Sequence, residues 1–340
     1  MQVSGVTMKA MGKRAQRALQ GLAAALGVLL LAACGGGTEQ VTPFEPSRYM
    51  VFGDELSYMT PAGTKYTVNA LNSDGNINCL ADGSNQPSRL WTQVLASAFS
   101  FVFAECNPNA RPVSAFIYAN PGAKAADFEA QVAAARAVHG SFGCHDLMSV
   151  LIGANDVIDL FENVYLPNPT SANKTAVLNE LTARGARLGQ LIAALTDNNG
   201  PNFIVSTAPL MNLTPYAAQM AIAFPNADVR NALHDFSENF NTALRVNIPN
   251  DGSRWGLVEL DALLQAGVNN PSTYGLNNTG DAACLPATWG TTACTTNTLV
   301  TNGNASTWLW ASDKWMGWRA HLNLGNFARS RAKDNPFGCG

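Results

Sequence analysis

Three short apolar runs, each followed within a few residues by Gly, Asn or Pro, constrain the fold of this chain more than any other feature. They cover residues 49–52, 148–152 and 203–206. Runs of this length are typical of strands that are buried on both faces of a parallel sheet. We therefore expect these three segments to be buried strands of a parallel sheet.

Two segments with helical spacing separate the runs. Residues 125–138 and 174–195 repeat apolar side chains every three or four positions, and Asn198-Asn199-Gly200 is a stop signal after the second. Strands that alternate with helices indicate βαβ units, so we predict one doubly wound α/β domain. The stretch from 269 to 306, rich in Asn, Thr and Gly, is predicted to be a long loop held by its cysteines.

The first 33 residues have the pattern of an export signal. Basic residues precede an apolar run between positions 22 and 31, and the run ends in Leu31-Ala32-Ala33-Cys34. This ending resembles the lipobox, at which a bacterial signal peptidase cuts and the cysteine is acylated. We predict a lipoprotein signal peptide over 1–33, lipid attachment at Cys34, a flexible tether over 34–47 and one domain over 48–340. Cleavage without lipidation, or an uncleaved anchor, is the alternative.

Charge limits the partners. The chain has 21 Lys and Arg against 24 Asp and Glu, a net charge of −3, which predicts no attraction to nucleic acid and no adsorption to anionic lipid. Membrane contact is therefore expected through the lipid anchor alone. Gly35 after Cys34, in place of an acidic residue, favours an outer-membrane lipoprotein that faces the periplasm or the cell surface, for a Gram-negative source. Oligomeric state is left open.

Cysteine usage agrees with export. Six cysteines remain after Cys34, and an even number in an oxidising compartment predicts up to three disulfides. Cys284 and Cys294 flank a short Pro/Gly/Thr segment and are predicted to pair, while the other pairings stay open. The spacings Cys-x-x-Cys and His-x-x-x-His do not occur, so neither a metal site nor a cofactor is expected.

Polar residues follow the predicted strands at the sheet edge where ligands bind in such folds. Gly53-Asp54-Glu55 follows the first run, Gly153-Ala154-Asn155-Asp156 follows the second, and Asp313 stands near the C-terminus. Asp54 and Asp156 are expected to cap the helices after them, the second beginning at Val157. Ser57, two residues beyond Glu55, is expected to point away from the cleft because two helical residues rotate by about 200°.

These segments resemble the sequence blocks of the SGNH/GDSL hydrolases, a family of secreted esterases and lipases. Flanking stretches resemble its lipase and phospholipase-like branch: 206–209, 213–215, 240–244 and 270–275, with Cys284 downstream. Residues 52–57 resemble the first block, Gly122 the second, 153–156 the third and 313–321 the last. The resemblance implies a flavodoxin-like three-layer α/β/α sandwich with a mainly parallel sheet. It also implies acyl-ester or lipid-like substrates and oxyanion-hole donors at Gly122 and Asn155.

Two positions depart from the family pattern. Glu55 stands where the family has its nucleophilic serine, and no histidine follows Asp313 by two or three residues; His321 comes eight residues later. A carboxylate at a helix N-terminus is a feeble base, and its attack on an ester would form an anhydride. The usual Ser-His-Asp mechanism is therefore not expected, and Glu55, Asp313 and His321 are the candidate catalytic set.

Three hypotheses follow from these features. In the first, the chain is a lipid-anchored ester hydrolase in which Glu55, Asp313 and His321 orient or activate water. In the second, it is an inactive descendant that binds acylated or polymeric ligands at the cell surface. In the third, it is a structural envelope lipoprotein whose cleft is filled by side chains such as Trp315 and Met316.

Overall fold

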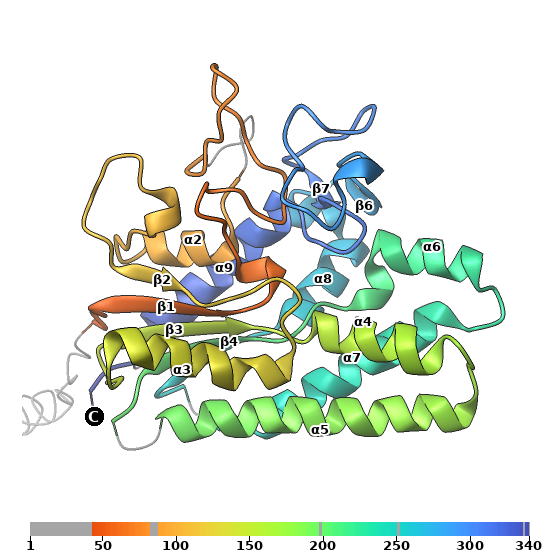
Figure 1. The fold of residues 1–340 in the computed structure, drawn as a ribbon, viewed down its shortest axis with the longest axis horizontal. Coiled ribbons are helices and arrows are strands. Elements are labelled where there is room, and N and C mark those ends of the chain that lie inside the picture. The colour runs from red at the N-terminus through yellow and green to blue at the C-terminus, as the bar shows by residue number, and fades with distance from the viewer. Residues whose placement is uncertain (1–42, 82–87, 197–198, 250–251, 336, 340) are drawn as a thin grey trace, which may run out of the picture. The chain divides into compact units, whose positions relative to one another are not determined.

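A five-stranded parallel sheet forms the centre of the fold (Figure 1). Its strands lie in the order β2-β1-β3-β4-β5, and every neighbouring pair is parallel. The strands are β1 (Arg48–Gly53), β2 (Ala115–Ile117), β3 (Asp146–Leu151), β4 (Asn202–Ser206) and β5 (Trp255–Val258). The predicted doubly wound architecture and its mainly parallel sheet are confirmed.

The computed structural model describes residues 43–81, 88–196, 199–249, 252–335 and 337–339. The predicted signal peptide, the lipid-attachment residue Cys34 and most of the predicted tether lie outside these ranges. The end of the predicted tether, residues 43–47, is described. Phe44 is buried there, and its ring packs edge-on against Phe99 and Phe337, with ring centroids 6.1 and 5.6 Å away. The folded part of the chain therefore includes residues before Arg48.

Burial explains which strands the sequence predicts. All six residues of β3 and all five of β4 are buried, which accounts for the apolar residues that make up most of each strand. The two strands that the apolar runs do not predict, β2 and β5, are the edge strands and have only three and four residues. Segments this short carry no readable periodicity.

Helices cover both faces of the sheet. In Figure 1, α3 and α5 lie below the sheet, whereas α2 and α9 lie above it. The predicted helices are confirmed as α3 and α5, with α3 extended at its start by a short 3-10 turn. The helices are α2 (Trp91–Ser97), α3 (Phe128–His139), α4 (Ala154–Leu160), α5 (Ser171–Thr196), α6 (Pro215–Ala223), α7 (Val229–Val246), α8 (Leu260–Asn269) and α9 (Trp318–Asp334).

The segment predicted as one long loop contains regular structure. A 3-10 turn, η6 (Pro271–Tyr274), precedes the strand β6 (Asn278–Ala282), which pairs in parallel with β7 (Trp308–Trp310). The prediction of a loop missed β6 because its sequence, Asn-Thr-Gly-Asp-Ala, has no apolar alternation.

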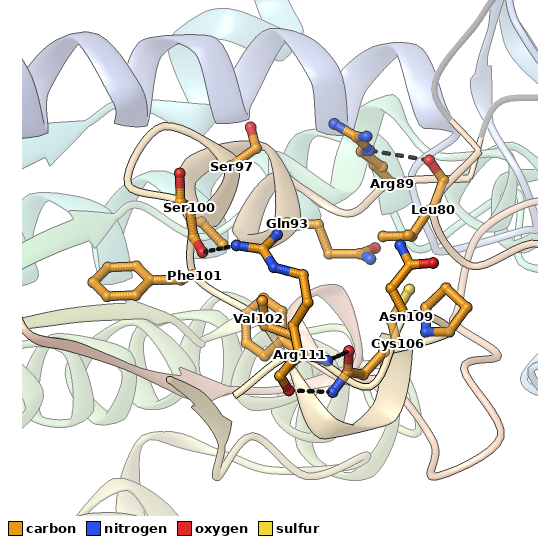
Figure 2. A pocket seen from close by; sticks show the side chains of 14 residues that line it. Leu80, Arg89, Gln93, Ser97, Ser100, Phe101, Val102, Cys106, Asn109 and Arg111 are labelled. Atoms are coloured by element: carbon orange, nitrogen blue, oxygen red, sulfur yellow. Dashed lines mark hydrogen bonds between the residues drawn. The ribbon is translucent and has the colours of Figure 1, made fainter. Parts of the chain in front are cut away.

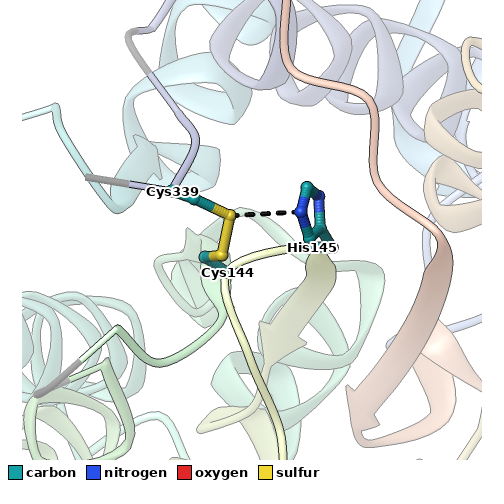
Figure 3. Close-up of side chains that lie close together, drawn as sticks. All are labelled: Cys144, His145 and Cys339. Atoms are coloured by element: carbon teal, nitrogen blue, oxygen red, sulfur yellow. Dashed lines mark hydrogen bonds between the residues drawn. A yellow bond between two sulfur atoms is a disulfide. The ribbon is translucent and has the colours of Figure 1, made fainter.

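Three disulfides join the six cysteines: Cys79–Cys106, Cys144–Cys339 and Cys284–Cys294. The predicted pair is therefore confirmed. His145 lies beside the second bridge, with its Nε2 3.3 Å from Sγ of Cys339 (Figure 3). Cys144, His145 and Cys339 are residue types that can bind a metal ion. The two sulfur atoms are bonded to each other in a disulfide, however, and are therefore not available as thiolate ligands.

Within the described ranges, no helix combines the length and the apolar character that crossing a bilayer requires.

Candidate active site

Glu55 stands at the turn where the first central strand ends. β1 finishes at Gly53, and Glu55 begins a 3-10 turn, η1 (Glu55–Ser57). Gly53 has a φ of +132°, and a Cβ there would lie 2.0 Å from the carbonyl oxygen of Leu151, so the turn requires glycine. Oδ1 of Asp54 accepts a hydrogen bond from the Leu56 amide at 3.0 Å, which confirms the predicted cap.

The Glu55 carboxylate lies between the two residues that the resemblance assigns to an oxyanion hole. Its Oε1 accepts a hydrogen bond from the backbone amide of Gly122 at 2.8 Å. Its Oε2 accepts one from Nδ2 of Asn155, also at 2.8 Å. Glu55 is only 7% exposed. Three predicted site residues from three separate turns therefore meet, and the carboxylate takes a hydrogen bond from each of the other two.

Asn155 is held in place from both sides. It lies in the first turn of α4, directly after β3, where Gly153 has a φ of +133° and a Cβ would come within 2.5 Å of the Phe240 ring. Its Nδ2 also donates to the carbonyl oxygen of Ala123 at 3.1 Å. The side-chain amide therefore ties the loop after β2 to the end of β3.

Acidic groups crowd this part of the molecule. Asp54 is fully buried, and its pKa is raised well above the ordinary value by burial first, then by the negative charges of Glu55 and Asp156. Oδ2 of Asp54 has no hydrogen-bond partner among the described residues.

Asp156 does not cap the helix that follows it, so that prediction is wrong. α4 begins at Ala154, which places Asp156 inside its first turn. Its Oδ2 instead accepts from the backbone amide of Ala125 at 2.8 Å, before α3, and its Oδ1 lies 3.2 Å from Nη1 of Arg184. Burial raises the pKa of Asp156, and these two partners oppose the shift.

Asp313 lies beside α6. Its backbone oxygen accepts from the Tyr216 amide at 2.9 Å, and burial raises the pKa of its carboxyl. The Tyr216 hydroxyl donates to Glu162 at 2.6 Å, and Nζ of Lys314 lies 4.7 Å from the centroid of the Tyr216 ring. The contacts of Asp313 are thus with α6 and its surroundings.

His321 is fully buried in α9. Its Nδ1 accepts from the backbone amide of Trp91 at 3.5 Å, and its Nε2 has no hydrogen-bond partner among the described residues. Burial, followed by the positive charge of Lys65, lowers its pKa to about 3. Across the described residues, no hydrogen bond joins any two members of the candidate set Glu55, Asp313 and His321.

Tyr66 was not singled out from the sequence, whereas Trp315 was named there as a side chain that could fill the cleft. Burial raises the pKa of the Tyr66 hydroxyl, and the negative charge of Glu55 raises it further. Trp315 packs edge-on against Tyr66 with the ring centroids 6.3 Å apart. Trp315 is 5% exposed and Met316 is fully buried. Tyr66 gave no signal because it lies in an irregular segment without periodicity.

Ser57 is buried behind this turn, and its Oγ accepts from the indole Nε1 of Trp91 at 3.2 Å. Gly122 also lines a hollow of about 530 Å³ together with Tyr118, Asn120 and Gln131. Neither Glu55 nor Asn155 belongs to that lining.

Comparison with known proteins places these observations in a family context. The family model of the GDSL-like lipases/acylhydrolases matches residues 49–284. Among curated proteins, none matches the chain.

Solved structures with a similar arrangement include an acetylxylan esterase, Axe2 from Geobacillus stearothermophilus (12% identity, 86% of this chain and 96% of that chain, TM-score 0.43). A second is phospholipase A1 from Streptomyces albidoflavus NA297, at 15% identity and a TM-score of 0.42, with 85% of this chain and 99% of that chain covered. A third is an extracellular lipase from Streptomyces rimosus, at 14% identity and a TM-score of 0.43, with 82% of this chain and 99% of that chain covered.

Proposed function

The chain belongs to the GDSL-like lipase/acylhydrolase family, and from that premise we propose that it is a member without ester-hydrolase activity. In this proposal the scaffold serves as a binding module for acylated or polymeric ligands of the bacterial cell envelope. The observation that carries the proposal is the pair of 2.8 Å hydrogen bonds that Glu55 accepts from Gly122 and Asn155.

These two bonds argue against hydrolysis by the family's chemistry. An oxyanion hole accelerates acyl transfer because its donors wait for the charge that develops on the substrate oxygen. In this chain the Glu55 side chain already accepts from both donors, so both are engaged before a substrate arrives. A substrate carbonyl would have to displace Glu55, and position 55, where the family has its nucleophilic serine, offers no hydroxyl to attack it.

The hypothesis of an altered hydrolase, in which Glu55, Asp313 and His321 activate water, has less support. A general base must lie within hydrogen-bond reach of the water that it deprotonates. His321 has no exposed surface, and a pKa of about 3 makes its imidazole a weak base. The amide of Trp91, rather than either carboxylate, is the hydrogen-bond partner of its Nδ1.

A purely structural envelope protein is the second candidate function, and the burial of Trp315 and Met316 is the observation that favours it. The two candidates differ in ligand binding. We would sediment the purified chain with acetylated cellulose and with tricaprin particles. A binding module is retained on at least one of them, whereas a structural protein is retained on neither.

Hydrolysis is tested with p-nitrophenyl acetate, butyrate and octanoate. We expect the native chain, Glu55→Ala and Glu55→Ser all to release nitrophenol at the rate of buffer alone, because the serine variant has no imidazole to activate it. Turnover by the native chain that disappears in Glu55→Ala would contradict the proposal and favour the altered hydrolase. A control for correct folding is an unchanged far-UV circular dichroism spectrum.

We further propose that acylation of Cys34 anchors the protein to the outer membrane. The support is the sequence Leu31-Ala32-Ala33-Cys34 after a basic and apolar leader. Radiolabelled palmitate supplied to cells that express the full chain should be incorporated into the native protein and not into Cys34→Ser. Equal labelling of both proteins would refute the anchor.

A further inference from the structure

A pocket of about 250 Å³ opens between α2 and the segment that leads from it to β2 (Figure 2). One wall is α2, which contributes Gln93 and Ala96, and the other is the loop that carries Arg111. Cys106 also lines the pocket, and its disulfide to Cys79 fixes that wall to the chain before α2. None of the proposed functions above uses this pocket.

The charge of the lining is positive. Arg89 and Arg111 line the pocket, and none of the described residues that line it is acidic. Arg111 donates through Nη2 to the carbonyl oxygen of Ser100 at 3.3 Å, and within the described ranges it pairs with no carboxylate. Figure 2 shows its side chain crossing the middle of the view toward Ser100. A guanidinium group bonded only to a neutral oxygen retains donors for an anion.

A further cation stands directly behind this wall. Lys65 is fully buried, and its ammonium donates to Oε1 of Gln93 at 3.1 Å. Its other acceptors are the carbonyl oxygens of Cys79 and Ser88 and the Ser88 hydroxyl, all of them neutral. A charge that is buried without a counter-ion acts over a longer range than an exposed one. In its protonated form, Lys65 therefore adds to the positive potential at the Gln93 wall.

The loop that carries Arg111 is held in a defined geometry. Oδ1 of Asn107 accepts from the Arg111 amide at 2.9 Å, and Nδ2 of Asn107 donates to the Arg111 carbonyl oxygen at 2.7 Å. This reciprocal pair closes the turn from 107 to 111. The base of the guanidinium side chain is therefore placed before any ligand arrives, which lowers the entropic cost of binding.

Apolar groups make up the remainder of the lining. They come from the segment before α2, from α2 itself and from the segment that leads to β2: Leu80, Ala96, Phe101, Val102, Phe103 and Pro108. An apolar surface next to the Arg111 guanidinium suits a ligand that has both an acyl or other apolar part and an anionic head.

We propose that this pocket binds an organic carboxylate with a short apolar tail, with the Arg111 guanidinium as the partner of the carboxylate and the apolar lining as the seat of the tail. The proposal is independent of Glu55 and of any hydrolytic activity.

Isothermal titration of the purified full chain with sodium octanoate tests the proposal. We expect saturable binding that weakens as sodium chloride is raised, because salt screens the contact with Arg111. Octanol, which lacks the charge, and inorganic sulfate, which lacks the tail, should each bind at least about tenfold more weakly than octanoate. Octanol or sulfate binding as tightly as octanoate, or no octanoate binding at all, would overturn the proposal.

Variants locate the ligand in the pocket. Arg111→Gln keeps the backbone bonds to Asn107 and should weaken octanoate about tenfold or more. Ser97→Phe places a ring in the pocket without removing charge and should also abolish binding. The matched control is Arg230→Gln, since Arg230 is an exposed arginine that likewise donates to one backbone carbonyl, that of Asn212. Octanoate affinity that is unchanged in both pocket variants refutes the site, and thermal unfolding of each variant verifies that it is folded.

Discussion

Asn155 donates its side-chain amide to the carboxylate of Glu55 across 100 residues of sequence, at a distance of 2.8 Å. Each of the two residues follows a central strand, β1 for Glu55 and β3 for Asn155, and these strands are neighbours in the sheet. Parallel pairing brings the two strand ends to one edge, so the contact is a direct consequence of the topology. The Glu55 carboxylate therefore occupies the hydrogen-bond donors, Gly122 and Asn155, that the resemblance assigns to a substrate oxygen.

Removing this carboxylate should destabilise the protein. Glu55→Ala leaves the Gly122 amide without its acceptor and takes from Asn155 one of its two bonds, which predicts a loss of about 1–3 kcal/mol in the free energy of unfolding. Urea denaturation followed by fluorescence measures it.

Acetate supplies the missing carboxylate as a small ion. We therefore expect acetate to restore part of the stability of Glu55→Ala and to leave the native chain unaffected. Glu45→Ala, which removes an exposed glutamate, is the control for general charge effects. A Glu55→Ala variant as stable as the native chain would show that the two hydrogen bonds contribute nothing net.

The ion pair between Arg184 and Asp156 should contribute far more to the free energy of unfolding than the ion pair between Arg187 and Glu129. Asp156 is fully buried and Arg184 keeps 24% exposure, so Arg184→Ala leaves a buried carboxylate without its cation. We expect a loss of about 2–3 kcal/mol, at or below the lower end for buried pairs because Arg184 is partly exposed. Arg187→Ala, one turn along and paired with exposed Glu129, should change stability by about 0.5 kcal/mol or less. Equal effects in urea denaturation would contradict this assignment.

His321 makes the fold acid-sensitive. Its folded pKa of about 3 lies below the unfolded value of about 6.5, so the unfolded chain takes up the proton first as the pH falls. Stability is therefore lost progressively below about pH 6.5, and the contribution reaches about 2 kcal/mol at pH 5.

The variant His321→Gln keeps a neutral acceptor for the Trp91 amide and should flatten the fall in unfolding free energy between pH 7 and pH 5. His234→Gln, on a side chain that is 45% exposed, serves as the control. The same pH slope in His321→Gln as in the native chain would exclude this histidine as the source.

Lys65 has a dependence of the same sign at alkaline pH. Burial, and then the positive charge of Arg89, lowers its pKa to about 7, whereas the unfolded value is about 10.4. The unfolded chain holds this proton more tightly, so stability should rise as the pH increases above 7, by about 2 kcal/mol at pH 9. Denaturation at pH 7 and pH 9 measures the gain. Lys65→Met should lose this gain in stability, whereas the control Lys333→Met, on an exposed side chain, should retain it. A native chain that is no more stable at pH 9 than at pH 7 would disprove the link between the Lys65 pKa and stability.

The sequence by itself determined the central strands, two long helices, the Cys284–Cys294 pair and the three turns where the candidate site lies. These features are local: apolar period, turn residues and a short cysteine spacing are written in neighbouring positions. The same reasoning failed for Asp156, whose partners Ala125 and Arg184 come from other elements.

Only the tertiary structure decided what those turns do. The sequence does not show that Glu55 would accept from Gly122 and Asn155, or that His321 would lie buried against Trp91. The sequence also does not show the other two disulfides, the neighbours of Tyr66 or the pocket around Arg111. Each depends on packing between segments far apart in the chain, and the free energy of such contacts is set by burial and geometry that exist only once the sheet and its helices have assembled.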